Sequence, residues 1–496
     1  MFMTDILSLL PRFPSVSRCA FLAVALAAAG SVPAKTVDTL ADPALAMTVN
    51  ERAYPVRVVD MMLMAAQQSR KDATWAQMLD SLVENQLIAA QGVRDVGREA
   101  LQAADKVGFT PQMVLEEQFN SLVKLYFFRQ IDGYVKQRRG LDDLLVWRIP
   151  ADHTGLKELT TLRDRGEVRL TPEQRKLAAA TVIAGMKLPD GTPRDITFED
   201  VYVRMNVQGR VRVIQDRDLK YLDNLVLSRV ESLFVGWWAE KQSGLSAAEI
   251  TALKTLLEEK QLRENYVLML GVVSTLHEDT TPHLARLQKT VTRDEIHAWY
   301  GKNREQFRQV EKVKARHIRC ATENDCNAAA AAIKNGMEFS AAAKKFSTAE
   351  DRNATPAGSL GWVLREPKQH VQELPWLHQV ALIQQKGQMS PPIRSPEDAR
   401  GNAVWEIVLV DERVEGYSPV DSETVAYLAR QEIAKKKAVQ QYTALRRQLV
   451  TEADIRRNGA LLKARHTPDD DKPRAEIEAP PSRGHDHGHG HGGHGH

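Results

Sequence analysis

The densest group of metal-binding side chains lies in the last residues of the chain. Residues 484–496 alternate glycine with six histidines, which are His485, His487, His489, His491, His494 and His496. Imidazole suits Ni, Cu and Zn, and the glycines keep the backbone flexible. We therefore expect this tail to bind one of these metals without a fixed geometry, and to lose it as the histidines protonate below about pH 6.5. The alternative is a solvated tail with little selectivity.

Other patterns that carry cofactor or nucleophile chemistry are missing from the sequence. His277, Glu278 and His283 lack the spacing that places two zinc ligands on one face of a helix, so we expect no metal site there. The sequence contains no phosphate-binding glycine loop and no hydrolase nucleophile elbow. We therefore expect a protein that requires no cofactor.

Two cysteines, Cys320 and Cys326, lie close together in the sequence, and the only other cysteine is Cys19. Their spacing is that of neither a zinc site nor a thioredoxin-like motif. In an oxidising compartment, a pair like this closes a small loop as a disulfide. The sequence leaves two interpretations open, a structural disulfide and two free thiols.

The first 34 residues have the parts of a secretory signal. Arg12 and Arg18 precede an apolar run over residues 19–30, and small or compact residues follow at 32–34. The run is shorter than the roughly 20 residues of a membrane-spanning helix, and no later segment is apolar enough to span. We expect cleavage after Ala34 and an exported, soluble product, in the periplasm if the source has two membranes. The alternative is an uncleaved anchor.

The composition limits the class of protein. A chain of 496 residues predicts about three domains. With 43% hydrophobic and 26% charged residues, it is neither a disordered chain nor a multispanning membrane protein. The 67 Lys and Arg residues nearly balance the 64 Asp and Glu residues, for a net charge of +3. We therefore expect no nucleic-acid partner, which would favour a strong basic excess.

The first half of the chain reads as mostly helical. Residues 48–58 suggest a short strand, and apolar residues three or four apart from Trp75 to Leu87 predict a helix. Thr110 and Pro111 form a helix start, and that helix is expected to run to Tyr134. We assign residues 35–140 to an N-terminal helical, chaperone-like module.

Residues 141–290 are expected to be a mixed region followed by helices, with a second helical module as one interpretation. Apolar residues from Leu219 to Trp237 follow helical spacing, and Ser246 with Glu249 has capping-box spacing for the next helix. Trp237 and Trp238 in this pattern favour a packed core over a ligand platform.

The pattern changes from Glu311. Strands are expected at 313–318 and 404–410, and helices at 328–335 and 339–346, which together make an α+β unit of about 100 residues. We assign 291–310 to a linker helix, 311–413 to this unit and 414–460 to a C-terminal helix. Residues 461–496 are expected to be a disordered, His-rich tail.

A series of short motifs makes the assignment of this unit specific. In order, they are Val291–Ile296, Trp299-Tyr300, Lys314–Ile318, Gly336–Phe339, Ala342–Ser347, Gly358–Trp362 and Lys386–Pro392. The series resembles the parvulin (PpiC-type) family of peptidyl-prolyl cis-trans isomerases. The flanking layout resembles SurA- and PpiC-type periplasmic folding factors, in which a helical module built from both chain ends surrounds the isomerase domain.

The resemblance implies a fold and an activity. The fold is α+β, with a helical module and a parvulin (FKBP-like) domain that has a four-stranded antiparallel sheet. The activity is rotation about X–Pro bonds, whose barrier is about 18–20 kcal/mol. An apolar pocket grips the proline ring, and polar groups stabilise the twisted amide more than the planar one.

The resemblance also assigns individual residues. His317 matches the first histidine of the family's histidine pair, and Leu360 matches the apolar residue that faces proline, with Trp362 in the same motif. Met389 and Ser390 match the turn before the last strand. The proline pocket of the family falls near Lys368 and Gln372, and an alignment shift brings Leu374 or Leu377 there instead.

The sequence departs from the family at two catalytic positions. Glu406 stands where the family has its second histidine, and Ala349 stands where the family has cysteine or aspartate. Glu350 or Asp351 is expected to substitute for the latter. Glu406 beside His317 is expected to raise the pKa of the imidazole. The alternative is that this pair only satisfies two buried polar groups.

These features predict an exported isomerase and folding chaperone whose partners are unfolded or nascent exported proteins with proline-containing segments. Two other functions remain open. The departures at Glu406 and Ala349 favour a chaperone that has lost catalysis, and the His-rich tail favours a metal-binding protein or metallochaperone.

Overall fold

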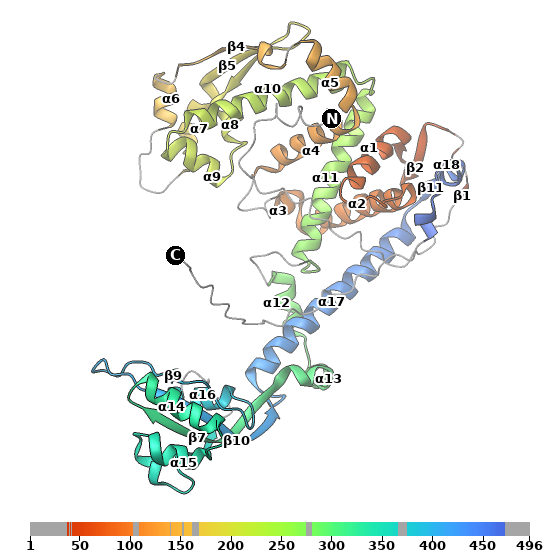
Figure 1. Cartoon of the computed structure of the whole chain (residues 1–496). Coiled ribbons are helices and arrows are strands. Elements are labelled where there is room, and N and C mark those ends of the chain that lie inside the picture. The colour runs from red at the N-terminus through yellow and green to blue at the C-terminus, as the bar shows by residue number, and fades with distance from the viewer. Residues whose placement is uncertain are drawn as a thin grey trace. The chain divides into compact units, whose positions relative to one another are not determined.

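The structure is a computed structural model that describes residues 37–38, 40, 42–102, 109–138, 140–150, 153–160, 168–273, 280–365 and 374–471 (Figure 1). The chain forms two compact units. The helical unit contains Met1–Arg286 and Lys435–His496, and the sheet unit contains Leu287–Ala434. The expected signal peptide, the histidines of the tail, and Lys368 and Gln372 lie outside the described residues. Among the described helices, none combines the length and apolar character needed to cross a bilayer.

Both ends of the chain build the helical unit. Strands β1 (Val37–Asp38), β2 (Leu45–Val49), β3 (Arg52–Pro55) and β11 (Ile455–Arg457) form one sheet in the order β1-β11-β2-β3. Strand β11 pairs antiparallel with β2 and parallel with β1. The single strand expected at 48–58 is a hairpin, because Asn50 and Glu51 take positive φ angles of 47° and 67° and turn the chain. The predicted contribution of both chain ends is confirmed.

The N-terminal helices begin where their caps predict. The first are α1 (Val56–Gln67), α2 (Trp75–Val96), α3 (Arg98–Gln102), α4 (Pro111–Tyr126) and α5 (Phe128–Gln137). The Thr110 side chain accepts a hydrogen bond from the Met113 N–H, with Pro111 in the first turn. The helix expected to continue to Tyr134 is interrupted at Phe127, whose φ of −104° and ψ of 25° are not helical.

Residues 141–290 contribute a sheet that the sequence did not reveal. Strands β4 (Leu145–Arg148), β5 (Val182–Lys187) and β6 (Pro193–Thr197) pair antiparallel in the order β4-β5-β6. Short helices α6 (Thr154–Leu159), α7 (Pro172–Ala180), α8 (Phe198–Tyr202) and α9 (Val207–Arg210) flank it, and a π-helical turn follows at Val211–Gln215.

The long helices α10 (Leu219–Lys241) and α11 (Ala247–Met269) follow, and then α12 (Pro282–Lys289). Ser246 and Glu249 form the predicted capping box at the start of α11. A single hydrophobic cluster contains buried residues from Ala46 to Leu257 together with Ile455, so residues 35–140 and 141–290 share one core.

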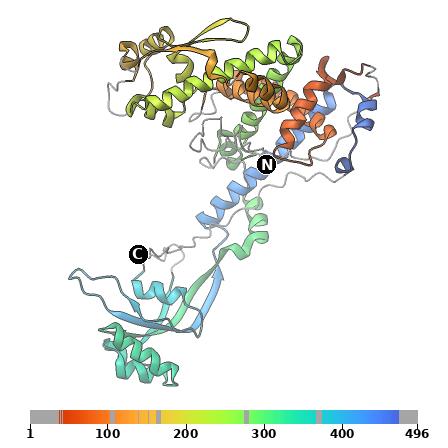
Figure 2. The ribbon, with the colours of Figure 1, turned by 45° about the horizontal axis from the view of Figure 1, so that its top comes forward.

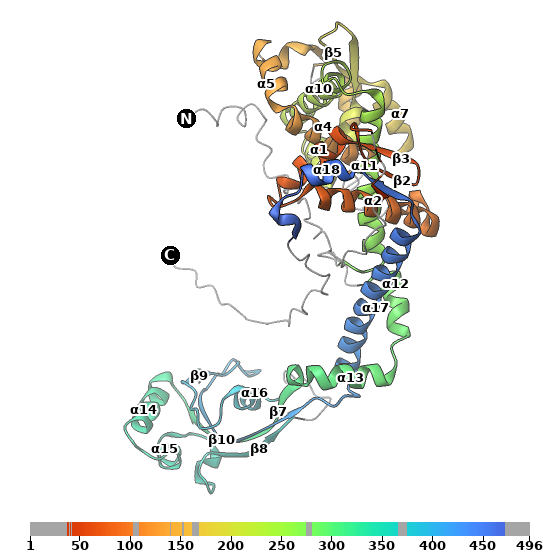
Figure 3. The ribbon, with the colours of Figure 1, turned by 90° about the vertical axis from the view of Figure 1, so that its right-hand side faces the viewer.

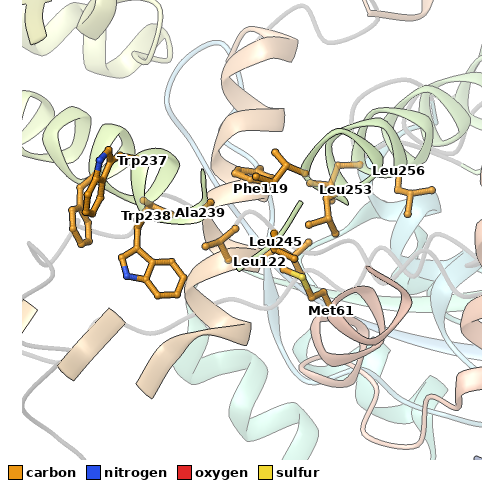
Figure 4. Close-up of a cluster of buried hydrophobic side chains, with 14 of the residues drawn as sticks. Met61, Phe119, Leu122, Trp237, Trp238, Ala239, Leu245, Leu253 and Leu256 are labelled. Carbon is orange, nitrogen blue, oxygen red and sulfur yellow. The ribbon is translucent and has the colours of Figure 1, made fainter. Parts of the chain in front are cut away.

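Figure 4 shows part of this core, where Met61, Leu122 and Leu245 lie together. Trp237 and Trp238 are 8% and 3% exposed, so both belong to the core.

The sheet unit has the predicted α+β architecture. Strands β7 (Arg308–Cys320), β8 (Ser359–Leu364), β9 (Ile393–Arg394) and β10 (Trp405–Tyr417) form an antiparallel sheet in the order β8-β7-β10-β9. The long strands β7 and β10 run side by side, green and blue in Figure 2. Its helices are α13 (Arg293–Asn303), α14 (Glu323–Lys334), α15 (Phe339–Phe346) and α16 (Trp376–Ile383). The predicted four-stranded fold is confirmed.

The segments that flank this sheet differ from expectation in their bounds. The linker helix ends at Asn303, and a 3₁₀ turn over Arg304–Phe307 leads directly into β7. Helix α17 (Glu423–Glu452) begins later and ends earlier than the expected helix. Within the tail expected to be disordered, α18 (Gly459–Ala464) and a 3₁₀ turn at Pro468–Asp471 are ordered.

The two faces of the sheet carry different cores. Helices α14 and α15 cover one face, with Ile318 and Ile407 of the strands, and this is called the α14/α15 face (Figure 3). Helix α16 covers the other face, with Val313 and Val408, and this is called the α16 face. Because side chains alternate along a strand, this division decides which side chains can meet.

Candidate active site

A buried histidine and glutamate meet on neighbouring strands of the α16 face. His317 Nδ1 lies 2.7 Å from Glu406 Oε2, and the two side chains are 3% and 1% exposed. The β7–β10 register pairs His317 with Val408 and Glu406 with Arg319, so the contact is diagonal. Glu406 is paired with Arg319 of β7 on one side and with Ile393 of β9 on the other, so it lies inside the sheet.

A carboxylate from a loop closes the other side of the imidazole. Asp351 lies in the 3₁₀ turn Glu350–Asn353, and its Oδ2 lies 2.6 Å from His317 Nε2. Gly358 ties the loop to the strand, because the His317 N–H donates to the Gly358 carbonyl and the Gly358 N–H donates to the Asp351 carbonyl. Each imidazole nitrogen of His317 therefore faces a carboxylate, Nδ1 that of Glu406 and Nε2 that of Asp351. This arrangement is called the His317 clasp.

The two carboxylates favour the protonated form of the imidazole. Burial lowers the pKa of His317, but the hydrogen bonds and charges of Glu406 and then Asp351 outweigh it, so the pKa is raised above its usual value. The second oxygen of Glu406 accepts a hydrogen bond from Arg319 Nε at 2.7 Å. Asp351, His317, Glu406 and Arg319 thus form a row in which acidic and basic side chains alternate.

An apolar surface lies on the same face of the sheet. Leu374 is buried, and Leu360 and Leu377 are partly buried against the core that contains Val313 and Val408. Leu360 reaches this face through a bulge, since Ala315 pairs with Gly361 and Arg316 pairs with Ser359, which leaves Leu360 as the extra residue. A charged row and an apolar surface therefore share one face.

Residues 291–426 match the family described as the PPIC-type PPIase domain. The sheet unit is a parvulin-type peptidyl-prolyl cis-trans isomerase domain. A search of curated protein sequences gives no significant match.

Solved structures with similarity to the chain include PrsA from Bacillus subtilis, which is 19% identical, with 54% of this chain and 91% of that chain covered and a TM-score of 0.17. A structure from Campylobacter jejuni, reported with the SurA-like chaperones PEB4 and Cj1289, is 15% identical, with 55% and 98% covered and a TM-score of 0.19. PrsA from Bacillus cereus is 15% identical, with 53% and 90% covered and a TM-score of 0.18. TM-scores this low carry no argument about this chain.

The charge state of His317 limits its part in the isomerase domain. When the imidazole is protonated, it has no free lone pair and is neither a base nor a nucleophile. X–Pro rotation needs neither, because the peptide bond twists without being broken. The row of charges can instead fix Asp351 and present a polar edge beside the apolar surface.

Two residues expected to bind substrate in the isomerase domain lie on the opposite face. Trp362 is opposite Lys314, and Lys312 Nζ lies 4.7 Å from the centre of its ring. The bulge at Leu360 is the reason, because strict alternation would have put Leu360 and Trp362 on one side. Met389 bridges to Leu409 and packs in the core of the α14/α15 face.

The loop of the isomerase domain brings one of the two candidate carboxylates into contact with His317. Asp351 contacts His317, whereas Glu350 is exposed to solvent. Ala349 is buried, and its N–H donates to the Ser347 hydroxyl, which also accepts from the Arg319 N–H. The structure thus brings together His317, Glu406 and Asp351 of the candidate catalytic residues.

The two cysteines are joined in the structure. Cys320 at the end of β7 and Cys326 in α14 form a disulfide, with their Cα atoms 5.5 Å apart, and both are fully buried. The bond ties the first turn of α14 to the strand that carries His317. Its place in the α14/α15 core makes it structural, away from the α16 face.

Sequence reasoning missed Arg319 in the isomerase domain. The residue lies two positions after His317 on the same strand and therefore on the same face. Its side chain is 40% exposed, and Nε binds Glu406. The sequence did contain a signal for Arg319, because a buried glutamate beside a histidine is stabilised by a further positively charged partner.

Metal binding has no candidate in the described part of the chain. No group of three or more His, Cys, Asp or Glu side chains there is arranged to hold an ion. The histidines at 485–496 lie outside the described residues.

Proposed function

We propose that this chain is an exported folding factor that accelerates cis/trans exchange of X–Pro bonds in unfolded exported proteins. The observation that carries the proposal is the isomerase domain in which the His317 clasp and the Leu360 surface share one face. The helical unit, in this proposal, holds the unfolded client while its prolines exchange.

The proposed reaction uses both parts of that face. The proline ring packs on the apolar surface at Leu360 and Leu374, which fixes one side of the X–Pro bond. The polar edge beside it, positioned by Asp351 and His317, favours the twisted amide, in which the nitrogen lone pair is no longer delocalised. No covalent bond forms or breaks, and no proton is transferred.

An exchange assay on a short Ala-x-Pro-x peptide tests the activity. We expect the wild-type chain to accelerate exchange, and we expect His317→Ala and Leu360→Ala to lose most of the acceleration. Trp362→Ala is the matched control, because it removes a large apolar side chain from the same strand on the opposite face. Equal loss in Leu360→Ala and Trp362→Ala would contradict the proposed pocket.

The proposed export depends on the N-terminal sequence. Arg12 and Arg18, the apolar run at 19–30 and the small residues before Lys35 support cleavage after Ala34. Mass spectrometry of the protein expressed with its full N-terminus in a bacterium with two membranes is expected to find the cleaved chain in the periplasmic fraction. An intact N-terminus that stays with the membrane would favour an anchor.

A specific observation favours a second function, a chaperone without catalysis. Glu406 occupies the place of the second histidine, and it turns the histidine pair of the family into an ion-paired row. Such a protein would suppress the aggregation of an unfolded client without accelerating X–Pro exchange. Measuring both properties on the wild-type chain separates the two functions.

We also propose that the tail at 484–496 binds Ni, Cu or Zn outside the isomerase reaction. The alternation of histidine with glycine supports this property. Titration of the full chain with each metal is expected to show binding that disappears when 484–496 is deleted, while peptide exchange is unchanged. Loss of exchange on deletion would instead link the tail to the isomerase activity.

A further inference from the structure

Two exposed apolar side chains lie on β8, at the edge of the sheet of the isomerase domain. The order β8-β7-β10-β9 gives β8 a neighbour on one side only among the described strands. Trp362 and Leu364 are two residues apart and lie on the α14/α15 face, where they are 40% and 55% exposed. Helices α14 and α15 cover the other end of this face, around Ile318 and Ile407. The β8 end of the face is therefore open.

The backbone of the same two residues points to the open side of β8. The Arg365 N–H donates to the Glu311 carbonyl at the start of β7, which continues the register of β7 with β8. Because backbone groups alternate in direction along an antiparallel strand, Trp362 and Leu364 turn their N–H and C=O groups away from β7. No described strand pairs with that side of β8. An added strand would bond to these groups and lie beside the two side chains.

The sequence of β8 lacks the side chains that usually keep an edge strand from pairing. Edge strands of natural proteins are commonly protected by charged residues, by proline or by a bulge. Ser359–Leu364 reads SLGWVL and contains neither a charge nor a proline. Its bulge is at Leu360, before the exposed pair. The stretch from Trp362 to Leu364 is therefore suited to pairing with a strand of a partner.

A lysine brings positive charge to this edge. Lys312 extends from β7 over β8, and its Nζ lies 4.7 Å from the centre of the Trp362 ring. In the described part of the chain Lys312 has no carboxylate partner, whereas Lys314 beside it pairs with Glu412 at 3.3 Å. An acidic side chain next to Trp362 would face the Lys312 ammonium. A second copy of β8 would instead bring a second lysine to the same place, so the charge favours an acidic strand.

We propose that the open edge of β8 binds an extended segment of a partner protein in which an acidic and an apolar residue lie two positions apart. The acidic residue lies beside Trp362 and faces Lys312, and the apolar residue packs against Leu364. The segment continues the sheet through its backbone, so it has no proline at the positions that donate. This surface goes beyond the proposed function, because it lies on the face of the sheet opposite Leu360 and does not require an X–Pro bond.

The probe is a short, labelled peptide in which every second residue is Thr and the others alternate between Glu and Val. A peptide with Lys in place of Glu is its control. Fluorescence anisotropy with the full chain is expected to show binding of the Glu peptide, and binding of the Lys peptide that is weaker by about tenfold or more. Hydrogen exchange followed by NMR should slow at the Trp362 and Leu364 amides but not at Val363, whose N–H already faces β7. No binding of the Glu peptide, or binding that leaves these two amides unchanged, would overturn the proposal.

Lys312→Glu reverses the charge at the edge and should reverse the preference, so that the Lys peptide binds more tightly than the Glu peptide. The gain of binding shows that the variant is folded. Lys345→Glu on α15 is the matched control, because Lys345 Nζ also lies over an aromatic ring, 5.0 Å from the centre of Phe346, and away from β8. We expect Lys345→Glu to bind both peptides like the wild type. An unchanged preference in Lys312→Glu, or the same change in both variants, would contradict the assignment of Lys312.

Two further measurements separate the proposal from its alternatives. Sedimentation of the wild-type chain is expected to show no dimer that the Glu peptide dissociates, and such a dimer would assign the edge to a second copy and overturn the proposal. Exchange of a short X–Pro peptide by the wild-type chain should be unchanged at saturating Glu peptide. Competition between the two peptides would place the Glu peptide on the Leu360 face and also overturn it. Binding of the Glu peptide by a wild-type chain without exchange activity would leave the β8 surface standing and sink only the isomerase function.

Discussion

His317 and Asp351 are joined twice, once through their side chains and once through Gly358. The side-chain contact is 2.6 Å between Nε2 and Oδ2. The backbone link runs from the His317 N–H to the Gly358 carbonyl at 2.8 Å, and from the Gly358 N–H to the Asp351 carbonyl at 2.9 Å. The loop that carries Asp351 is therefore coupled to strand β7, and the backbone link places the carboxylate against the imidazole.

Glu406→Gln should weaken the isomerase domain and lower the pKa of His317. Burial lowers this pKa, and the hydrogen bond and charge of Glu406 are the largest contributions that raise it. The amide keeps the shape of the carboxylate but leaves Arg319 without a charged partner. We expect the free energy of unfolding of the sheet unit to fall by about 3 kcal/mol, measured by urea unfolding followed at an NMR signal of β7.

Glu412→Gln is the matched control for this change. Glu412 lies on the same strand, its side chain is 53% exposed, and it pairs with Lys314 at 3.3 Å. We expect a change of less than about 0.5 kcal/mol, because exposed ion pairs contribute little. Equal losses of unfolding free energy in the two variants would mean that the buried contacts of Glu406 stabilise the unit no more than the exposed Glu412–Lys314 pair does.

The stability of the isomerase domain should depend on pH through His317. Its pKa in the folded state is raised above the ordinary value of about 6.5. The stabilisation is therefore fully present below about pH 6.5 and is lost as the pH rises through the folded pKa. The difference in unfolding free energy between wild type and His317→Gln should shrink over that rise. A difference that stays constant or grows would show that the imidazole is neutral in the clasp.

Gly358→Ala should disrupt the link between His317 and Asp351. Gly358 has a φ of +73°, and a Cβ there would lie 2.3 Å from the His317 carbonyl oxygen. Gly401→Ala is the control, since its φ of +78° is similar and its Cβ position is open. We expect about 1–2 kcal/mol of destabilisation from the backbone angle alone in Gly401→Ala and a larger loss in Gly358→Ala, measured by thermal unfolding. Equal losses of stability in the two variants would show that the clash with the His317 carbonyl oxygen contributes nothing.

Local features of both units could be predicted because they depend on neighbours in sequence. Helix α15 occupies Phe339–Phe346, as its composition predicts, and Thr110 and Ser246 cap the expected helices. The faces of Trp362 and Met389 could not be predicted in the same way. They depend on the bulge at Leu360 and on how the chain turns before β10, which single-residue alternation does not encode.

The β4-β5-β6 sheet of the helical unit could not be predicted from the sequence, for a physical reason. Strands β5 and β6 contain Gly185 and Pro193, which weaken a strand pattern. Gly185 is required by its neighbour, because a Cβ there would lie 2.2 Å from the Trp147 indole nitrogen. Gly185 therefore weakens the strand pattern in the sequence, and the same glycine leaves the space in which the Trp147 ring packs on β5.

A buried glutamate should decide how firmly the C-terminal helix is held in the helical unit. Glu84 of α2 is 6% exposed, and its Oε1 accepts from Arg263 at 2.5 Å and from the Tyr442 hydroxyl at 2.6 Å. Its Oε2 accepts from Arg446 at 2.7 Å. One carboxylate thus joins α2, α11 and α17.

Glu84→Gln should loosen this junction, because the buried Arg263 and the partly buried Arg446 lose their shared anion at once. We expect about 3 kcal/mol of destabilisation, seen as faster hydrogen exchange of the backbone around Tyr442. Glu452→Gln is the control, since Glu452 is exposed on α17 and is bonded to Gln448. Similar exchange rates in the two variants would mean that apolar packing alone holds α17.

The same junction should respond to acid in the direction opposite to His317. Burial raises the pKa of Glu84, but Arg263 and Arg446 outweigh it and the pKa is lowered. The stabilisation is therefore present above the ordinary glutamate value of about 4.3 and is lost as the pH falls through the folded pKa. The stability difference between wild type and Glu84→Gln should shrink only on that fall, which urea unfolding of both proteins over an acidic pH series measures. A difference that persists below the folded pKa would show that the carboxylate stabilises the junction by its shape and not by its charge.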